Sequence, residues 1–225
     1  MITEDLPRIF EPQPIHPLVA RRSAMLTIDV QRGQVFSLAN KVRDAGLHDI
    51  ATAYDSAVQA ILPRIRMLQD QCRARHIEVI HLRFGSFSGT GSDCSQPFRL
   101  CGHEAAAWDR SDQIIDAVVA PHPGEIVMNK VSSGAFNGSD LDALLRRLGI
   151  DTLIVAGLVT ASCVESTIRG AADCGYNVFV ASDACADWTD QQHELSLAIL
   201  GRWFATVLDT ERILRLIAGV ENDRA

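Results

Sequence analysis

The feature that most constrains this chain is the alternation of short apolar runs with longer amphipathic stretches. The apolar runs are rich in Val, Ile and Leu and predict six strands, at 24–30, 77–84, 125–131, 151–158, 176–184 and 205–209. The amphipathic stretches predict helices at 50–76, 111–119, 139–149, from about 163, at 191–204 and at 210–220. Near-continuous apolar strands alternating with helices are typical of a parallel sheet covered on both faces. We therefore predict an α/β fold with three α-β-α layers and a six-stranded, mostly parallel sheet.

The length of 225 residues and a hydrophobic content of 47% suit one domain with a buried core. We expect residues 1–22 to form an N-terminal arm, because prolines interrupt them, and residues 23–225 to form a single domain. A net charge of −7 argues against non-specific binding to nucleic acid. No stretch approaches the ~18 apolar residues of a membrane span. The first 17 residues lack the cationic start and apolar run of a signal peptide.

The six cysteines are scattered along the chain and form no disulfide framework, so we expect reduced thiols and a cytoplasmic protein. Cys94, Cys101 and His103 could suggest a zinc site. They lack the closely paired ligands of structural zinc sites, and we predict neither a metal nor a cofactor.

Three chemically reactive residues follow three predicted strands. Asp29 stands in "LTIDVQRG", where a carboxylate inside an apolar strand needs a partner, although it could simply cap a loop. Lys130 ends "EIVMNK" and is one of only two lysines beside nineteen arginines, although a surface lysine is the alternative. Cys163 follows the fourth strand near a helix start, which favours its thiolate, although a buried apolar cysteine is the alternative.

In a parallel sheet these three residues lie near the same edge. The carboxylate can then act as a general base for the thiol, while the ammonium stabilises the thiolate. No Cys/His pair is placed comparably, because His81 lies in mid-strand and His193 on a helix face.

The segments "LTIDVQRG", "VMNKVSSGAF" and "LIVAGLVTASCVESTIRGAADCGYNVFVASDACAD" resemble, in order and spacing, the isochorismatase-like cysteine hydrolases. The resemblance runs from about residue 23 to the C-terminus. It implies a six-stranded Rossmann-like sheet and a catalytic Asp29, Lys130 and Cys163. It also implies a cis peptide bond before Val159, with the Val159 and Cys163 N–H groups as an oxyanion hole.

The same resemblance places Phe36 and Phe136 where the family lines its pocket with aromatic rings, although core packing explains either equally well. Gln31, two residues past Asp29, is close enough to contact the substrate or to support the carboxylate. Nicotinamidases of this family carry an Asp/His/His metal site after the second strand, whereas this chain has no histidine between His81 and His103.

Isochorismate-cleaving members lack the cysteine, so Cys163 favours the amidase branch. The expected function is hydrolysis of a C–N bond in a small-molecule amide or carbamoyl substrate, through a thioester and with release of ammonia. We expect a homo-oligomer, a dimer or tetramer, partly from the resemblance and partly because apolar side chains of the arm need a surface: Ile9, Phe10, Ile15 and Leu18. The alternatives are an isochorismatase-type hydrolase of another small metabolite, a catalytically idle binding protein, and a redox sensor pairing Cys163 with Cys174 or Cys185.

Overall fold

The computed structural model describes residues 16–33, 38–100 and 114–220. They contain a six-stranded sheet in the order β3-β2-β1-β4-β5-β6, and every neighbouring pair is parallel. The strands are β1 (Ser23–Ile28), β2 (Glu78–Phe84), β3 (Ile126–Lys130), β4 (Thr152–Leu158), β5 (Asn177–Ala186) and β6 (Thr206–Leu208). The predicted fold class is confirmed, with a sheet that is parallel throughout.

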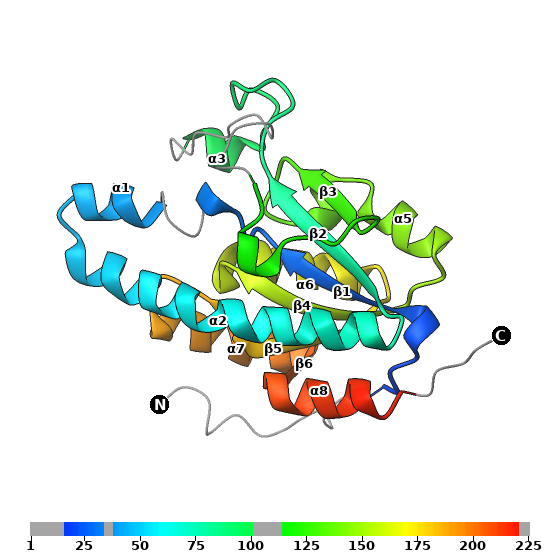
Figure 1. The fold of residues 1–225 in the computed structure, drawn as a ribbon. Coiled ribbons are helices and arrows are strands. Elements are labelled where there is room, and N and C mark those ends of the chain that lie inside the picture. The colour runs from blue at the N-terminus through cyan, green and yellow to red at the C-terminus, as the bar shows by residue number, and fades with distance from the viewer. Residues whose placement is uncertain (1–15, 34–37, 101–113, 221–225) are drawn as a thin grey trace.

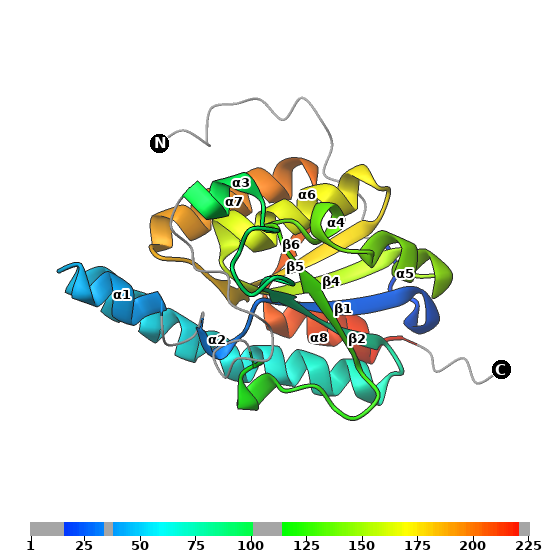
Figure 2. The same cartoon turned by 90° about the horizontal axis from the view of Figure 1, so that it is seen from above.

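Helices cover both faces of the sheet, as Figure 1 and Figure 2 show. One face is covered by α2 (His48–Ala74) and α8 (Thr210–Ala218). The other is covered by α5 (Leu141–Arg147), α6 (Glu165–Asp173) and α7 (Asp190–Trp203). The shorter elements are η1 (Ala20–Arg22), α1 (Leu38–Asp44), α3 (Gln96–Leu100), η4 (Ala117–Val119), α4 (Ala135–Gly138) and a π-helical turn, η5 (Thr160–Val164).

The position of β1 in the sheet explains why most of its residues are apolar. All six residues are buried, because the strand is central and helices cover both of its faces. Met25 packs into the cluster beneath α2 and α8, whereas Leu26 and Ile28 pack into the cluster beneath α5 and α6. The alternation of side chains along a strand therefore supplies both layers of the core.

The predicted helix at 111–119 is wrong where the structure describes it. Ile115 pairs with Gln31 in an isolated antiparallel bridge, and only η4 makes a single 3-10 turn. The Asp116 N–H donates to the Val30 carbonyl, and the Arg32 N–H donates to the Ile114 carbonyl. Because these backbone groups pair with the segment after β1, they are not available to a helix.

Most of the predicted N-terminal arm, residues 1–15, lies outside the described residues. Within its described part, η1 leads directly into β1. No helix in the described ranges combines the length and the apolar character needed to cross a membrane.

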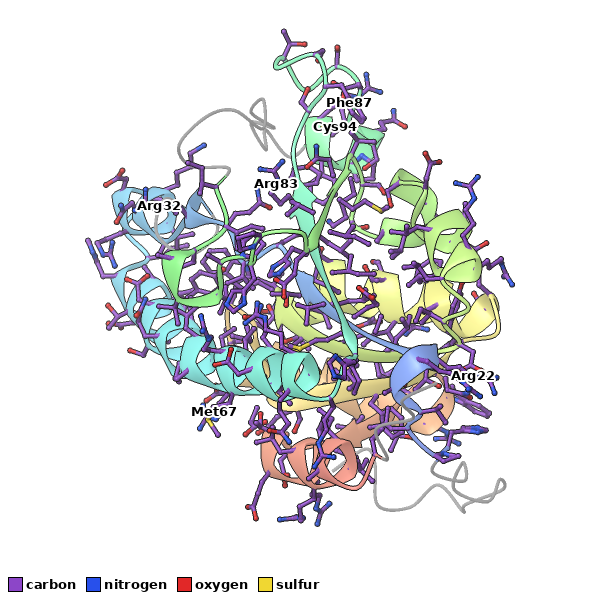
Figure 3. The ribbon with its side chains drawn as sticks, turned by 45° about the vertical axis from the view of Figure 1, so that its right-hand side comes forward. Arg22, Arg32, Met67, Arg83, Phe87 and Cys94 are labelled. Atoms are coloured by element: carbon purple, nitrogen blue, oxygen red, sulfur yellow. The ribbon has the colours of Figure 1, made fainter. Side chains whose placement is uncertain are left out.

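The order of the strands reverses between β1 and β4, which lie side by side at the centre of the sheet. In open parallel sheets, ligands bind at such a reversal, outside the carboxyl ends of the strands. In Figure 3, Arg22 marks the edge at which β1 begins, and Phe87 and Cys94 stand beyond the opposite edge, where β2 ends. A ligand site is therefore expected at the edge of the sheet near Phe87.

Gly157 allows β1 and β4 to approach each other closely at this edge. Its φ is +133°, and a Cβ there would lie 2.7 Å from the Ile28 backbone nitrogen and closer still to the Ile28 carbonyl oxygen. A side chain at this position would have to push two central strands apart.

We expect Gly157→Ala to destabilise the protein severely, by more than about 3 kcal/mol, or to prevent folding. Gly175→Ala is the matched control, because Gly175 has a φ of +90° but open space around its Cβ position. The control should lose only about 1–2 kcal/mol from its backbone conformation. Denaturant unfolding of both variants measures the difference, and equal losses would contradict the close approach.

Candidate active site

Asp29 lies directly after β1, in a backbone conformation that few residues adopt. Its φ is +52°, in the left-handed region, and its N–H donates to the Leu82 carbonyl at 3.0 Å. A non-glycine residue held there costs about 1–3 kcal/mol, and such strain clusters at functional sites. The side chain is only 1% exposed. The fold therefore fixes a buried carboxylate at the reversal point of the sheet.

Lys130 ends β3 and is completely buried, which is unusual for a lysine. Its Nζ lies 2.7 Å from Asp29 Oδ2, donates to the Ser132 carbonyl at 2.9 Å, and sits 5.2 Å from the centre of the Phe84 ring. Burial by itself lowers the pKa of Lys130, but the negative charge of the adjacent Asp29 outweighs it and raises that pKa. The ammonium therefore stays charged as the partner of Asp29.

The Asp29 carboxylate keeps capacity for a further interaction. Apart from the ion pair with Lys130, neither of its oxygens accepts a hydrogen bond of regular geometry within the described part of the chain. A buried carboxylate with unused acceptor sites can receive a proton from a neighbouring group.

Cys163 lies in η5, directly beyond β4, and is buried. Burial raises the pKa of its thiol to about 12; Lys130 lowers that pKa, and Asp29 raises it. Both charged groups therefore lie within interaction range of the sulfur. The sequence-based expectation of a favoured thiolate is not met in this resting state, because removal from water outweighs the ammonium. At neutral pH the thiol keeps its proton.

The turn that carries Cys163 is held by hydrogen bonds at both ends. The peptide bond between Leu158 and Val159 is cis, as the resemblance implies. The Val159 carbonyl accepts from the Val164 N–H at 3.3 Å, and Asp187 Oδ2 accepts from the Ala161 N–H at 2.5 Å. These bonds position the backbone around the thiol.

A cavity of about 330 Å³ opens at this edge of the sheet. Its lining residues come from the ends of β1, β2 and β4, from α3, from η5, from the segment after β5 and from the first turn of α7: Asp29, Phe84, Phe98, Leu158, Val159, Ala161, Ser162, Cys163, Asp187, Trp188 and Gln192. Its size suits a small molecule.

The structure brings the sequence-predicted residues together only in part. Asp29, Val159 and Cys163 line the cavity, and Lys130 lies buried behind Asp29. Gln31 is not on the cavity wall: its amide accepts from the Phe84 N–H at 2.8 Å and donates to the Phe84 carbonyl at 3.0 Å. These two hydrogen bonds connect Gln31 to the last residue of β2, away from the cavity lining.

Phe136 is also absent from the cavity wall. Its ring packs 5.5 Å from that of Tyr176, in the cluster beneath α5 and α6. Phe136 is therefore a core-packing residue, which was the alternative to substrate contact. Phe36 lies outside the described residues.

Sequence reasoning missed several of the residues that shape the cavity, although Trp188 lies in a loop-like stretch beside the expected cleft. The rings of Phe84 and Phe98 are tilted to each other with their centroids 4.5 Å apart, and Trp188 stacks on Tyr54 at 4.0 Å. Phe84 ends a predicted strand, a position that could have drawn attention. Asp187 and Gln192 carried no comparable signal.

Among the described residues, no group of three His, Cys, Asp or Glu side chains is arranged to hold a metal ion. Cys101 and His103, which could have joined Cys94 in a zinc site, lie outside the described ranges.

The isochorismatase domain model matches residues 23–212. The chain belongs to the isochorismatase family. The matched span contains every described residue of the cavity wall, so the family assignment covers the whole candidate site.

Curated members of the isochorismatase family resemble the chain over different spans. The uncharacterized isochorismatase family protein YecD of Escherichia coli O157:H7 is 38% identical over 45% of this chain, a match that spans only 54% of YecD. Ureidoacrylate amidohydrolase RutB of Stutzerimonas stutzeri is 30% identical over 77% of this chain and 73% of RutB.

A solved structure extends the likeness to nearly the full length. The crystal structure of a cysteine hydrolase from Pseudomonas syringae pv. phaseolicola 1448A superimposes with a TM-score of 0.78 and 27% identity, covering 91% of this chain and 96% of that one. Proteins named as amidohydrolases are therefore among the relatives of this family member.

Proposed function

We propose that this hydrolase cleaves a C–N amide or carbamoyl bond of a small molecule, with Cys163 as its nucleophile. The observation that carries the proposal is the buried Asp29–Lys130 ion pair of 2.7 Å, placed beside the Cys163 thiol at a cavity of small-molecule size. A buried charge pair is costly to maintain, and perturbed titratable groups cluster at functional sites.

In the first step the thiol and the base act together. Because the pKa of Cys163 is about 12, the resting sulfur is protonated at neutral pH. Asp29 takes the thiol proton as Sγ attacks the carbonyl carbon, and Lys130 compensates the charge that moves between them. The Val159 and Cys163 N–H groups stabilise the oxyanion that forms on the carbonyl oxygen.

In the second step the C–N bond breaks. Asp29 returns the proton to the leaving nitrogen, ammonia departs, and a thioester to Cys163 remains. Asp29 then takes a proton from a water molecule, whose oxygen attacks the thioester carbon. The C–S bond then breaks, Asp29 returns the proton to Sγ, and the acid departs from the regenerated thiol.

Ammonia release from a panel of small amides and carbamoyl compounds tests this function. At least one substrate should release ammonia in proportion to acid product. Hydrolysis without ammonia would favour the alternative of an isochorismatase-type hydrolase of another metabolite. Binding without turnover across the panel would favour a catalytically idle binding protein.

The redox-sensor alternative with Cys174 is disfavoured by the length of α6. Cys163 precedes this helix and Cys174 follows its last residue. A helical rise of 1.5 Å per residue separates them by roughly 16 Å, whereas a disulfide needs Cα atoms within about 7 Å. The other candidate is a disulfide between Cys163 and Cys185. We expect mass spectrometry after mild peroxide treatment to detect no such disulfide.

We expect full activity after exhaustive chelation. The region after β2 lacks the histidines of the nicotinamidase metal site, and the described residues offer no metal-ligand cluster. The measurement is turnover after prolonged dialysis against a chelator. Activity that is lost and then restored by a divalent ion would contradict this prediction.

We also propose a homo-oligomer, a dimer or tetramer. Helix α7 exposes Leu195, Ile199 and Trp203, which recur at every fourth residue and so follow one helix face. Covering such a face removes apolar surface from water. Light scattering at micromolar concentration should give a dimeric or tetrameric mass, and a monomeric mass would refute the proposal.

A further inference from the structure

Asp187 is a buried carboxylate on the cavity wall that the proposed chemistry does not use. It follows β5, is 5% exposed, and lines the same cavity as Cys163. Its Oδ2 accepts from the Ala161 N–H at 2.5 Å and its Oδ1 from the Trp188 N–H at 2.8 Å. Two carboxylate oxygens offer about four acceptor sites, so two remain for a ligand.

The charge of Asp187 is not neutralised as that of Asp29 is. Asp29 has Lys130 at 2.7 Å, whereas no lysine or arginine among the described residues forms an ion pair with Asp187. Within the described ranges, no cationic side chain lines the cavity. The remaining lining near Asp187 is the Gln192 amide and the aromatic rings of Phe84, Phe98 and Trp188.

The part of the cavity around Asp187 should bind anionic ligands less favourably than neutral ones. Repulsion between two negative charges is much stronger in a partly buried site than in water. A ligand carboxylate would also lose its hydration without gaining a cationic partner. An N–H donor, in contrast, could bond to Asp187 while an apolar or planar group packs against the rings.

We propose that Asp187 makes the cavity select neutral or cationic amides that present an N–H donor, and exclude compounds that carry a carboxylate. The inference rests on the proposed function, since it assigns a substrate class to the same cavity. It separates this chain from the relative named for ureidoacrylate, an anionic compound.

Two thiol reagents of nearly equal size test the selection without any knowledge of the substrate. Iodoacetamide is neutral and iodoacetate is anionic, and each forms a thioether with a cysteine Sγ as iodide leaves and the thiol proton is lost. Peptide mapping gives both rates at Cys163, and exposed Cys174 on the same chain corrects for intrinsic reactivity. We expect the preference for iodoacetamide to be on the order of tenfold larger at Cys163 than at Cys174.

Three variants assign the selection to the charge at position 187. Asp187→Asn should reduce the excess preference at Cys163 to within about twofold of that at Cys174. Asp190→Asn is the matched control: it removes the same charge from an exposed residue outside the cavity lining and should leave the preference unchanged. Gln192→Lys adds a cation to the wall without touching Asp187 and should also raise the rate with iodoacetate.

The alkylation rates can overturn the proposed selectivity in three ways. Equal preferences at Cys163 and Cys174 in the unmodified protein would overturn the inference, as would an unchanged preference in both Asp187→Asn and Gln192→Lys with the fold intact by circular dichroism. Failure of both reagents at Cys163 even at alkaline pH, while Cys174 reacts, would show that the thiol is not reached from the cavity and would overturn the inference. Selective alkylation without ammonia release from any neutral amide would support the cavity's selectivity and reject the proposed hydrolysis.

Discussion

Cys163→Ser is expected to abolish hydrolysis and to leave the fold intact. An alcohol is a far weaker acid than a thiol, so Asp29 would have to remove a proton that is much harder to take. Because the resting thiol of Cys163 is itself protonated, the reaction depends on this proton transfer at every turnover. We expect turnover to fall by on the order of 10³ or more.

Ammonia release and thermal unfolding together measure this effect. The melting temperature should change by only a few degrees, because sulfur is replaced by a smaller atom beside a cavity that already exists. Cys174→Ser is the control, since Cys174 is exposed and outside the cavity lining. Substantial turnover in the Cys163 variant would show that another group is the nucleophile.

Lys130→Arg should be the second most damaging change, although it conserves charge. The completely buried ammonium forms an ion pair with Asp29 and donates a hydrogen bond to the Ser132 carbonyl. It also lies within interaction range of the Cys163 sulfur. The longer, planar guanidinium cannot occupy the same volume, so it must displace Asp29 or the thiol. A misplacement of ~1 Å can lower the rate by on the order of 100-fold.

The burial of Lys130 also changes what its replacement does to stability. Replacement of a lysine side chain that faces solvent at a strand end would affect turnover more than stability. Since the structure buries it completely, we expect overpacking to lower the free energy of unfolding by about 1–3 kcal/mol as well. Lys41→Arg, on an exposed position of α1, should change neither quantity. Near-wild-type rates for both variants would remove Lys130 from the proposed triad.

The fold and the centre of the site could be predicted because both follow from local patterns. Apolar runs alternating with helical stretches indicate a parallel sheet, and in such a sheet the strand ends share one edge. Asp29, Lys130 and Cys163 each end or follow a strand, so their sequence positions were sufficient to bring them together.

The rest of the site depends on tertiary packing that local patterns do not contain. Asp187, directly after β5, and Gln192, in the first turn of α7, line the cavity because the end of β5 and the start of α7 lie beside it. The pairing of Gln31 with the Phe84 backbone could not be predicted, because proximity along the chain to Asp29 does not determine which way its amide points. The pKa of Cys163 was misjudged because position near a helix start was considered without burial.

The order β3-β2-β1-β4 has a consequence for how the protein acquires activity as it refolds. Asp29 and Lys130 belong to strands that β2 separates, and Cys163 follows a strand on the other side of β1. Asp29, Lys130 and Cys163 therefore come together only when β3, β2, β1 and β4 have paired. These contacts join residues far apart in the sequence, and they form late because they require the closure of large loops. After dilution from denaturant, helical circular dichroism should therefore return before enzymatic turnover. Recovered activity would then report completion of the whole sheet.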